Sequence, residues 1–400
     1  MDGSRKHSYK KKTYMKVGLI DADLLDNGTT FPNLAIMKMS AFLKSKGIHT
    51  ELLMDGNNID SYDVITVSKV FTSTNEPSFI HGYKGSVMYG GTGWYMGNAH
   101  DNSFNDIRYE DLHDLPNTKL FNGLLWGTQM PDYHIYDSFI ETIKRKGKLK
   151  AYHSSYTDFS IGFLTRGCFR KCPFCVNRNE SKVFKYSELS DFLDSDRKVI
   201  SLLDDNFLGY AGWEDDLTEL QATGKQFQFK QGLDIRLLTP NRASMLSKSK
   251  YYGDYTFAFD NIKDKDVIPR KLDLWRNITD KSTKLYLFCG FGIGTSRELL
   301  IKDILELFER IEILMRYKCL GYVMRYKDYA LHPMSNIYVQ IARWVNQPSF
   351  YKKMSFRQFC ELNQKGVQKE CMSMRTLKFM YDEFPEYRSR LNHYFNMKYE

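Results

Sequence analysis

The sequence predicts an α/β protein with two successive strand–helix regions and a helical C-terminal extension. Short apolar runs alternate with helix-length segments along most of the 400 residues, a pattern typical of parallel sheets with crossover helices. From residue 161 onward, run after run ends in a polar residue or a glycine, as expected for a barrel whose site lies at the carboxyl ends of its strands. The length suggests two or three domains, and no apolar run reaches the roughly 20 residues that span a bilayer.

Residues 14–125 are expected to form a small parallel-sheet domain. Its helix is predicted to begin near Thr30 and Pro32 and to stop at Gly47, because these residue types favour helix ends. Residues 22–30 are predicted to be loop, and the polar stretch 126–160 a connection to the next domain. The strands are expected at 15–21, 49–53, 63–71 and 86–89.

Residues 161–345 are predicted to form a partial (β/α)6 barrel of the TIM type, and residues 346–400 a basic, aromatic helical extension packed on it. Segments of helix length separate the six strands of the barrel. The strands are expected at 161–165, 199–203, 226–230, 255–259, 284–289 and 320–324.

The charge and cysteine content suggest a cytoplasmic protein. The net charge is +9, but residues 1–13 contribute five basic and one acidic residue and are expected to be a disordered basic tail. The remaining mild basicity permits a nucleic-acid partner without requiring one. The seven cysteines form no disulfide framework, and no export signal is visible.

Three cysteines with C-x3-C-x2-C spacing form the most informative motif of the chain: Cys168, Cys172 and Cys175. Three thiolates are one too few for a closed four-ligand site, and they suit a [4Fe–4S] cluster with one iron left open. A zinc site would normally show paired C-x2-C units or nearby histidines, and the nearest histidine before the motif is His153. A zinc or structural iron–sulfur site stays as the alternative.

This motif resembles the signature of the radical S-adenosylmethionine (radical SAM) superfamily, including the small Gly167 before the first cysteine and Phe174 before the third. The resemblance implies that the three cysteines are the catalytic cluster ligands and that Phe174 lies beside the adenine of S-adenosylmethionine (SAM). It also implies reductive cleavage of SAM to a 5′-deoxyadenosyl radical, which abstracts hydrogen from an unidentified substrate. An electron donor such as flavodoxin or ferredoxin would then be a partner.

Further SAM-site residues are expected at other strand ends. Asp204 and Asp205 follow the second strand, where the resemblance implies a site for the SAM ammonium group; adjacent side chains point to opposite sides, so one can face the mouth and the other support the loop. Arg236 can clamp the SAM carboxylate or pair with a neighbouring aspartate. Gly290 and Gly292 can let the backbone approach the adenosine or can form a plain turn.

The first domain resembles the Rossmann-like cobalamin-binding domain that precedes many radical SAM barrels, with SVMYGGTGW at 86–94 similar to its glycine turn. The cobalamin motif D-x-H-x-x-G is absent, because residues 21–26 contain no histidine. This argues against histidine-ligated cobalamin, although cobalamin bound without that histidine stays open. The alternative functions are a cobalamin-dependent radical SAM methyltransferase and a non-catalytic nucleic-acid or protein-binding module with a structural metal. A nucleotide or nucleic-acid substrate is conceivable, and no membrane is expected.

Overall fold

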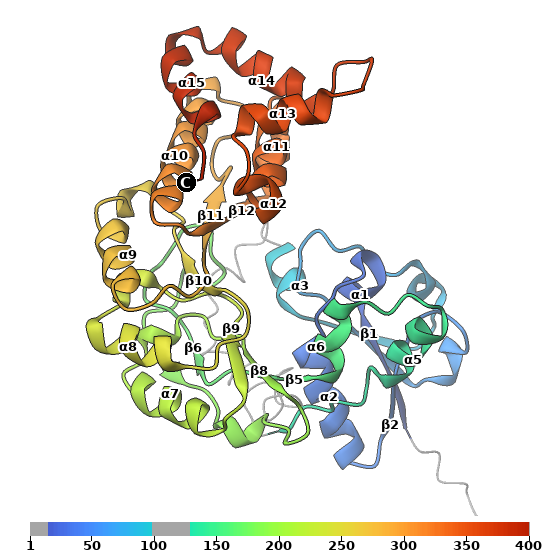
Figure 1. Cartoon of the computed structure of the whole chain (residues 1–400). Coiled ribbons are helices and arrows are strands. Elements are labelled where there is room, and N and C mark those ends of the chain that lie inside the picture. Colours follow the sequence, from blue (N-terminus) through green and yellow to red (C-terminus); the bar gives the residue numbers. More distant parts are fainter. Residues whose placement is uncertain (1–14, 98–128, 400) are drawn as a thin grey trace, which may run out of the picture. The chain divides into compact units, whose positions relative to one another are not determined.

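The computed structural model describes residues 15–97 and 129–399, and these form two compact α/β units (Figure 1). The first unit comprises the described residues up to Gly162 together with Ser187–Lys198, and the second comprises Phe163–Tyr186 and Val199 onward. The predicted basic tail, residues 1–13, and the stretch 98–128 lie outside the described residues. In the described part, no helix is both long enough and apolar enough to cross a membrane.

The first unit contains a four-stranded parallel sheet in the order β2-β1-β3-β4. All four strands lie where the sequence predicts strands, and buried Val17, Leu19, Ile65 and Val67 anchor the central pair. Its strands are β1 (Lys16–Asp21), β2 (His49–Leu52), β3 (Val64–Ser68), β4 (Ser86–Gly90) and, outside this sheet, β5 (Phe159–Gly162). Its helices are α1 (Ala22–Asn27), α2 (Leu34–Ser45), α3 (Thr92–Gly97), α5 (Asp137–Arg145) and α6 (Ser154–Thr157).

The loop predicted over residues 22–30 is wrong, because a short helix, α1, follows β1 directly. The Asp21 carboxylate accepts a hydrogen bond from the Leu24 backbone N–H at 3.2 Å and caps the helix start. Gly28, with φ 60°, ends the helix in the left-handed conformation that favours glycine. Helix α2 correspondingly begins after the capping residue Asn33, three residues later than predicted.

The segment predicted to be a connection contributes to the core of the first unit. Tyr133, Ile135, Tyr136 and Tyr156 are buried against the apolar face of β1 and α2. The stretch is polar on average, but it contains these four large side chains, which pack onto elements more than 85 residues earlier in the sequence. The described part of this segment therefore folds with the first unit.

The second unit contains parallel strands that follow one another in chain order with a helix after each of the first four. β8 pairs with β9, and β10 pairs with β11 and β11 with β12, all in parallel. Two further parallel bridges, Phe227 to Tyr251 and Leu233 to Phe257, connect the β9 and β10 regions. The strands are β8 (Val199–Leu202), β9 (Gln226–Phe229), β10 (Tyr255–Ala258), β11 (Thr283–Cys289) and β12 (Leu320–Arg325). The helices between them are α7 (Trp213–Ala222), α8 (Pro240–Lys248), α9 (Ile268–Arg276) and α10 (Arg297–Arg316).

A small antiparallel pair and five C-terminal helices complete the second unit. β6 (Thr165–Arg166) pairs with β7 (Phe184–Lys185), and the cysteine motif lies between them. Buried aromatic side chains attach the C-terminal helices, since Phe308 of α10 stacks on Tyr394 at 5.6 Å between ring centroids and also contacts Phe356. These helices are α11 (Asn336–Val345), α12 (Pro348–Tyr351), α13 (Phe356–Gln364), α14 (Met372–Glu383) and α15 (Arg388–Asn396).

Candidate active site around the cysteine loop

The three cysteines of the motif lie on one short loop with free thiols. Cys168, Cys172 and Cys175 are each partly buried and form no disulfide. The Cys175 backbone N–H donates to the Cys172 carbonyl at 3.0 Å, so this part of the loop folds back as a tight turn. Within the described residues, no three His, Cys, Asp or Glu side chains converge on a single-ion site.

Gly167 gives the loop its entry angle. Its φ is 86°, and a Cβ atom at this position would lie 2.4 Å from the Lys182 carbonyl oxygen. A larger residue would therefore be strained in conformation and would also collide with the backbone of the segment just before β7. The glycine expected before the first cysteine is required by close backbone packing.

The loop directs N–H groups at two of the cysteine sulfurs. The Arg170 backbone N–H lies 3.5 Å from the Cys168 sulfur, and the Asn177 backbone N–H lies 3.4 Å from the Cys175 sulfur. Burial raises the pKa of the Cys175 thiol to about 11, and the pKa of Cys172 is also raised, chiefly by burial. Metal binding requires the thiolate, so a bound cation would have to offset this cost. Three soft donors with N–H support fit a [4Fe–4S] cluster.

Asp204 holds the chain just before the cysteine loop. Its carboxylate is 1% exposed and accepts hydrogen bonds from the Leu164 N–H at 3.2 Å, the Thr165 N–H at 2.6 Å and the Thr165 hydroxyl at 2.7 Å. Burial raises the pKa of Asp204 to about 7, although these hydrogen bonds favour the ionised form.

Asp205 holds the next part of the same segment. Its carboxylate accepts from the Gly167 N–H at 2.9 Å and lies 3.6 Å from the Arg166 guanidinium nitrogen Nε. The sequence suggested that one of the two aspartates supports the loop and the other faces the mouth. In the structure both contact the segment that carries the cysteines, and contact of either with SAM stays a prediction.

Arg236 is paired within the chain. Its guanidinium grips the Asp234 carboxylate through Nε at 2.7 Å and through Nη2 at 3.1 Å, and Nη1 donates to Asp264 at 2.8 Å. Asp234 also accepts from Arg170 of the cysteine loop at 2.6 Å. Arg236 is therefore paired with neighbouring aspartates, the alternative that the sequence left open. A SAM carboxylate would have to displace Asp234 or Asp264 to bind this guanidinium group.

The residues predicted to surround the adenosine lie together at the end of β11. Phe174 stacks on Phe288 with 3.8 Å between ring centroids and meets Phe291 edge-on at 6.0 Å. Gly290 and Gly292 flank Phe291 with φ values of 79° and 69°, and the Gly290 N–H donates to Asp303 at 2.8 Å. These two glycines occupy conformations that side chains rarely adopt, and the cysteine loop contacts their turn through Phe174.

Two polar residues near the loop were not predicted from the sequence to belong to the site. Asn206 is 3% exposed, and its amide nitrogen lies 3.5 Å from the Cys168 sulfur. Asp260 follows β10, burial raises its pKa to about 6, and its charge acts on the Cys172 thiol. One oxygen of Asp260, Oδ1, is buried without a hydrogen-bond partner among the described residues. Asp260 could have been predicted, because it follows directly after a predicted strand, as Asp204 does.

The carboxyl edge of the first unit's sheet is occupied by its own polar contacts. The Tyr136 hydroxyl donates to Asp21 at 2.7 Å, and the pKa of Asp21 is raised to about 6 by burial. Asp23, which stands where the cobalamin motif has histidine, is 2% exposed and accepts from the Val70 N–H at 2.6 Å and from the Thr74 hydroxyl. These residues do not fit a histidine-ligated cobalamin.

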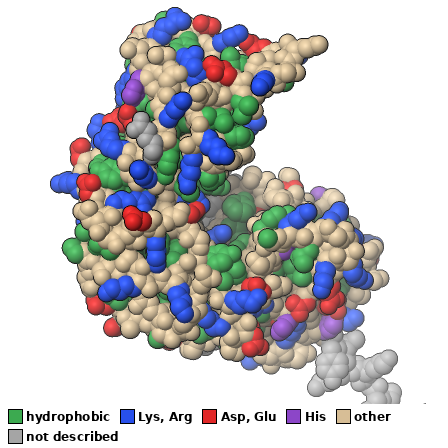
Figure 2. Space-filling model, in the orientation of Figure 1, with side chains coloured by type: hydrophobic (Ala, Val, Ile, Leu, Met, Phe, Trp, Pro, Cys, Tyr) green, Lys and Arg blue, Asp and Glu red, His purple; other side chains and the backbone are tan. Residues whose placement is uncertain are grey.

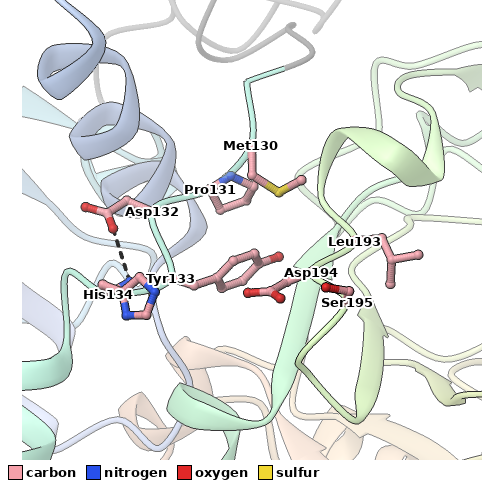
Figure 3. A pocket seen from close by; sticks show the side chains of 8 residues that line it. All are labelled: Met130, Pro131, Asp132, Tyr133, His134, Leu193, Asp194 and Ser195. Atoms are coloured by element: carbon pink, nitrogen blue, oxygen red, sulfur yellow. Dashed lines mark hydrogen bonds between the residues drawn. The ribbon is translucent and has the colours of Figure 1, made fainter.

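A cavity of about 390 Å³ in the first unit is lined by residues other than the predicted site residues (Figure 3). Asp132 and His134 line one side, where the His134 backbone N–H donates to the Asp132 carboxylate at 3.1 Å. Leu193, Asp194 and Ser195 line the other side.

No family model and no curated protein sequence matches this chain. Among solved structures, it is similar to the radical SAM methyltransferase TsrM from Kitasatospora setae, with cobalamin and a [4Fe–4S] cluster bound, at 11% identity and a TM-score of 0.48 over 78% of this chain and 72% of TsrM. It is also similar to the cobalamin-dependent radical SAM enzyme OxsB with aqua-cobalamin bound, at 13% identity and a TM-score of 0.32 over 78% of this chain and 49% of OxsB. The chain thus spans about half of OxsB. Both of these solved structures are radical SAM enzymes described with cobalamin.

Proposed function

We propose that this chain is a radical SAM enzyme. The observation that carries the proposal is the loop of three free cysteines, held by Asp204 and Asp205 and supplied with N–H donors to its sulfurs. An open-iron [4Fe–4S] cluster, when bound, supplies reductive cleavage of SAM to a 5′-deoxyadenosyl radical that abstracts hydrogen from a substrate. Neither the similar solved structures, with TM-scores below 0.5, nor their ligands are needed for this proposal.

The chain's own residues have distinct tasks in this proposal. Cys168, Cys172 and Cys175 hold the cluster, and the adenosine lies against Phe174 and the glycine turn after β11. Asp260 replaces Asp204 and Asp205 as the preferred acceptor for the SAM ammonium group. This choice is supported by its oxygen Oδ1, which is buried without a hydrogen-bond partner among the described residues, although the Asp260 carboxylate, like those of Asp204 and Asp205, also has a backbone hydrogen bond, here from Phe288.

The proposal includes the predicted fold, a partial (β/α)6 barrel preceded by a Rossmann-like unit. Parallel pairing of β8–β12 in chain order, with a helix in each connection, supports the barrel. The sheet order β2-β1-β3-β4 supports the Rossmann-like unit, which then serves as a scaffold or a lid.

The partners of the enzyme follow from the chemistry it would perform. A low-potential electron donor such as flavodoxin or ferredoxin is needed, and a reducing cytoplasm would supply it. Basic and acidic side chains are interspersed on the face shown in Figure 2. The class of substrate, a nucleotide or nucleic acid included, stays open.

Anaerobic reconstitution with iron and sulfide tests the proposal. About four iron atoms per chain and release of 5′-deoxyadenosine only with SAM and a reductant are expected. Cys172→Ala should abolish both, because it removes one cluster ligand. Cys371→Ala is the matched control, since Cys371 is equally free and partly buried but lies outside the loop. Stoichiometric zinc in place of iron would instead support a structural metal site and contradict an enzyme of this class.

A further inference from the structure

Three consecutive residues after β8 contact successive parts of the segment that carries the cysteines. Asp204 binds Thr165, Asp205 binds Gly167, and Asn206 reaches Cys168 itself. The first two contacts fix backbone N–H groups, whereas the third touches a sulfur. The end of β8 therefore fixes not only the path of the loop but also the surroundings of one cluster ligand.

The Asn206 side chain has little freedom to move. It is 3% exposed, and Gly209 packs so closely that a Cβ atom there would lie 3.3 Å from the Asn206 Cγ and 2.8 Å from the Phe169 ring. A thiolate is an acceptor only, so the amide must present its nitrogen to Cys168. In this orientation the amide oxygen, Oδ1, is buried and has no hydrogen-bond partner among the described residues. Burying the amide oxygen without a partner costs folding free energy, yet the Asn206 amide lies where its N–H can reach the sulfur of Cys168.

We propose that Asn206 is a positioning residue that raises the reduction potential of the cluster through its N–H hydrogen bond to the Cys168 sulfur. This inference rests on the proposed function, because it needs a cluster on the three cysteines. A cluster gains negative charge when it is reduced, and an N–H dipole aimed at a ligand sulfur stabilises that charge. Removing the donor should therefore make the cluster harder to reduce.

The test is a redox titration of the reconstituted full-length protein, followed by the electron paramagnetic resonance signal of the reduced cluster. Asn206→Leu keeps a similar volume and removes the donor, so we expect reduction to become about tenfold less favourable, a potential about 59 mV lower for one electron. Asn206→Asp should lower the potential further, because a carboxylate replaces the donor. Asn177→Leu is the matched control: Asn177 is also buried, but it reaches the Cys175 sulfur through its backbone N–H, which the substitution keeps.

The outcomes separate this inference from the proposed function. If the wild-type protein assembles no [4Fe–4S] cluster, the proposed function fails and the inference fails with it. If the cluster assembles and both Asn206 variants keep the wild-type potential, the inference is wrong and the proposed function stands. An equal drop in Asn177→Leu would also overturn the inference, because it would show a general effect of repacking. Should Asn206→Leu fail to fold, the near-isosteric Asn206→Asp decides by itself.

Discussion

Replacing Asp204 with asparagine should remove the pH dependence of stability that this residue causes. Its pKa rises from 3.8 to about 7 in the folded chain, which makes ionisation of the folded state cost on the order of 4 kcal/mol. Because the folded-state pKa is raised, the contribution of the protonated Asp204 carboxyl to the stability of the folded state is fully present below pH 3.8. This contribution is lost as the pH rises through about 7. The wild-type protein should therefore lose about 3 kcal/mol from this group between pH 5 and pH 8, while an asparagine loses none.

At pH 5 the Asp204→Asn variant should be less stable than wild type by about 1–3 kcal/mol. The asparagine oxygen can still accept from Thr165, but its NH2 group would face the Leu164 N–H, which then lacks an acceptor. At pH 8 the difference should vanish or change sign. Both trends come from one carboxyl group buried at the base of the cysteine loop.

Urea unfolding of the metal-free protein at pH 5, 6, 7 and 8, followed by tryptophan fluorescence, measures this difference directly. Asp215→Asn on α7 is the control, because it makes the same charge change at an exposed position. Groups such as Asp21 and Asp260 titrate in both proteins and cancel in the comparison. A wild-type minus variant difference that stays constant from pH 5 to pH 8, or grows with pH, would refute the reasoning.

Two further predictions concern the other ligand sites. Asp260→Asn should weaken SAM binding about 10- to 100-fold, since a hydrogen bond to a charged group contributes about 1.5–3 kcal/mol. The iron content should stay unchanged. If isothermal titration calorimetry finds equal SAM affinities for the variant and the wild type, the ammonium group binds elsewhere. The wild-type chain should not co-elute with aqua-cobalamin in gel filtration. Asp23 stands where the cobalamin motif has its histidine, and its carboxylate already accepts hydrogen bonds from the loop after β3. A stoichiometric co-eluting complex would show that cobalamin binds without a histidine ligand.

Local sequence pattern was sufficient for the strands and for the cysteine loop. The longer strands lie where apolar runs predicted them, and β1, β3, β5 and β8 each contain a run of four or five buried residues that carries its own signal. Gly167 was identified by its place before the first cysteine, and the structure explains it by a positive φ and close backbone packing. The helix α1 was missed, although Asp21 and Gly28 mark its two ends, because six residues contain too few apolar positions to show a helical period.

Long-range contacts explain the remaining errors. Tyr133, Tyr136 and Tyr156 lie in a polar stretch, and only the folded chain places them against β1 and α2. The α/β class and the polar residues at the strand ends could therefore be predicted from local sequence, whereas membership of this stretch in the first unit could not.

The sequence by itself determined the spacing of the three cysteines, the glycine that lets their loop turn, and the strands that follow in order. These features depend on residue type and on spacing within a few positions. Only the tertiary structure decided which carboxylates are already committed to the backbone, which one keeps an unpartnered oxygen, and that Asn206 reaches the Cys168 sulfur. The physical reason is that these hydrogen bonds join residues 38 to 40 positions apart in the chain, so their partners are selected by packing after the loop and the end of β8 meet.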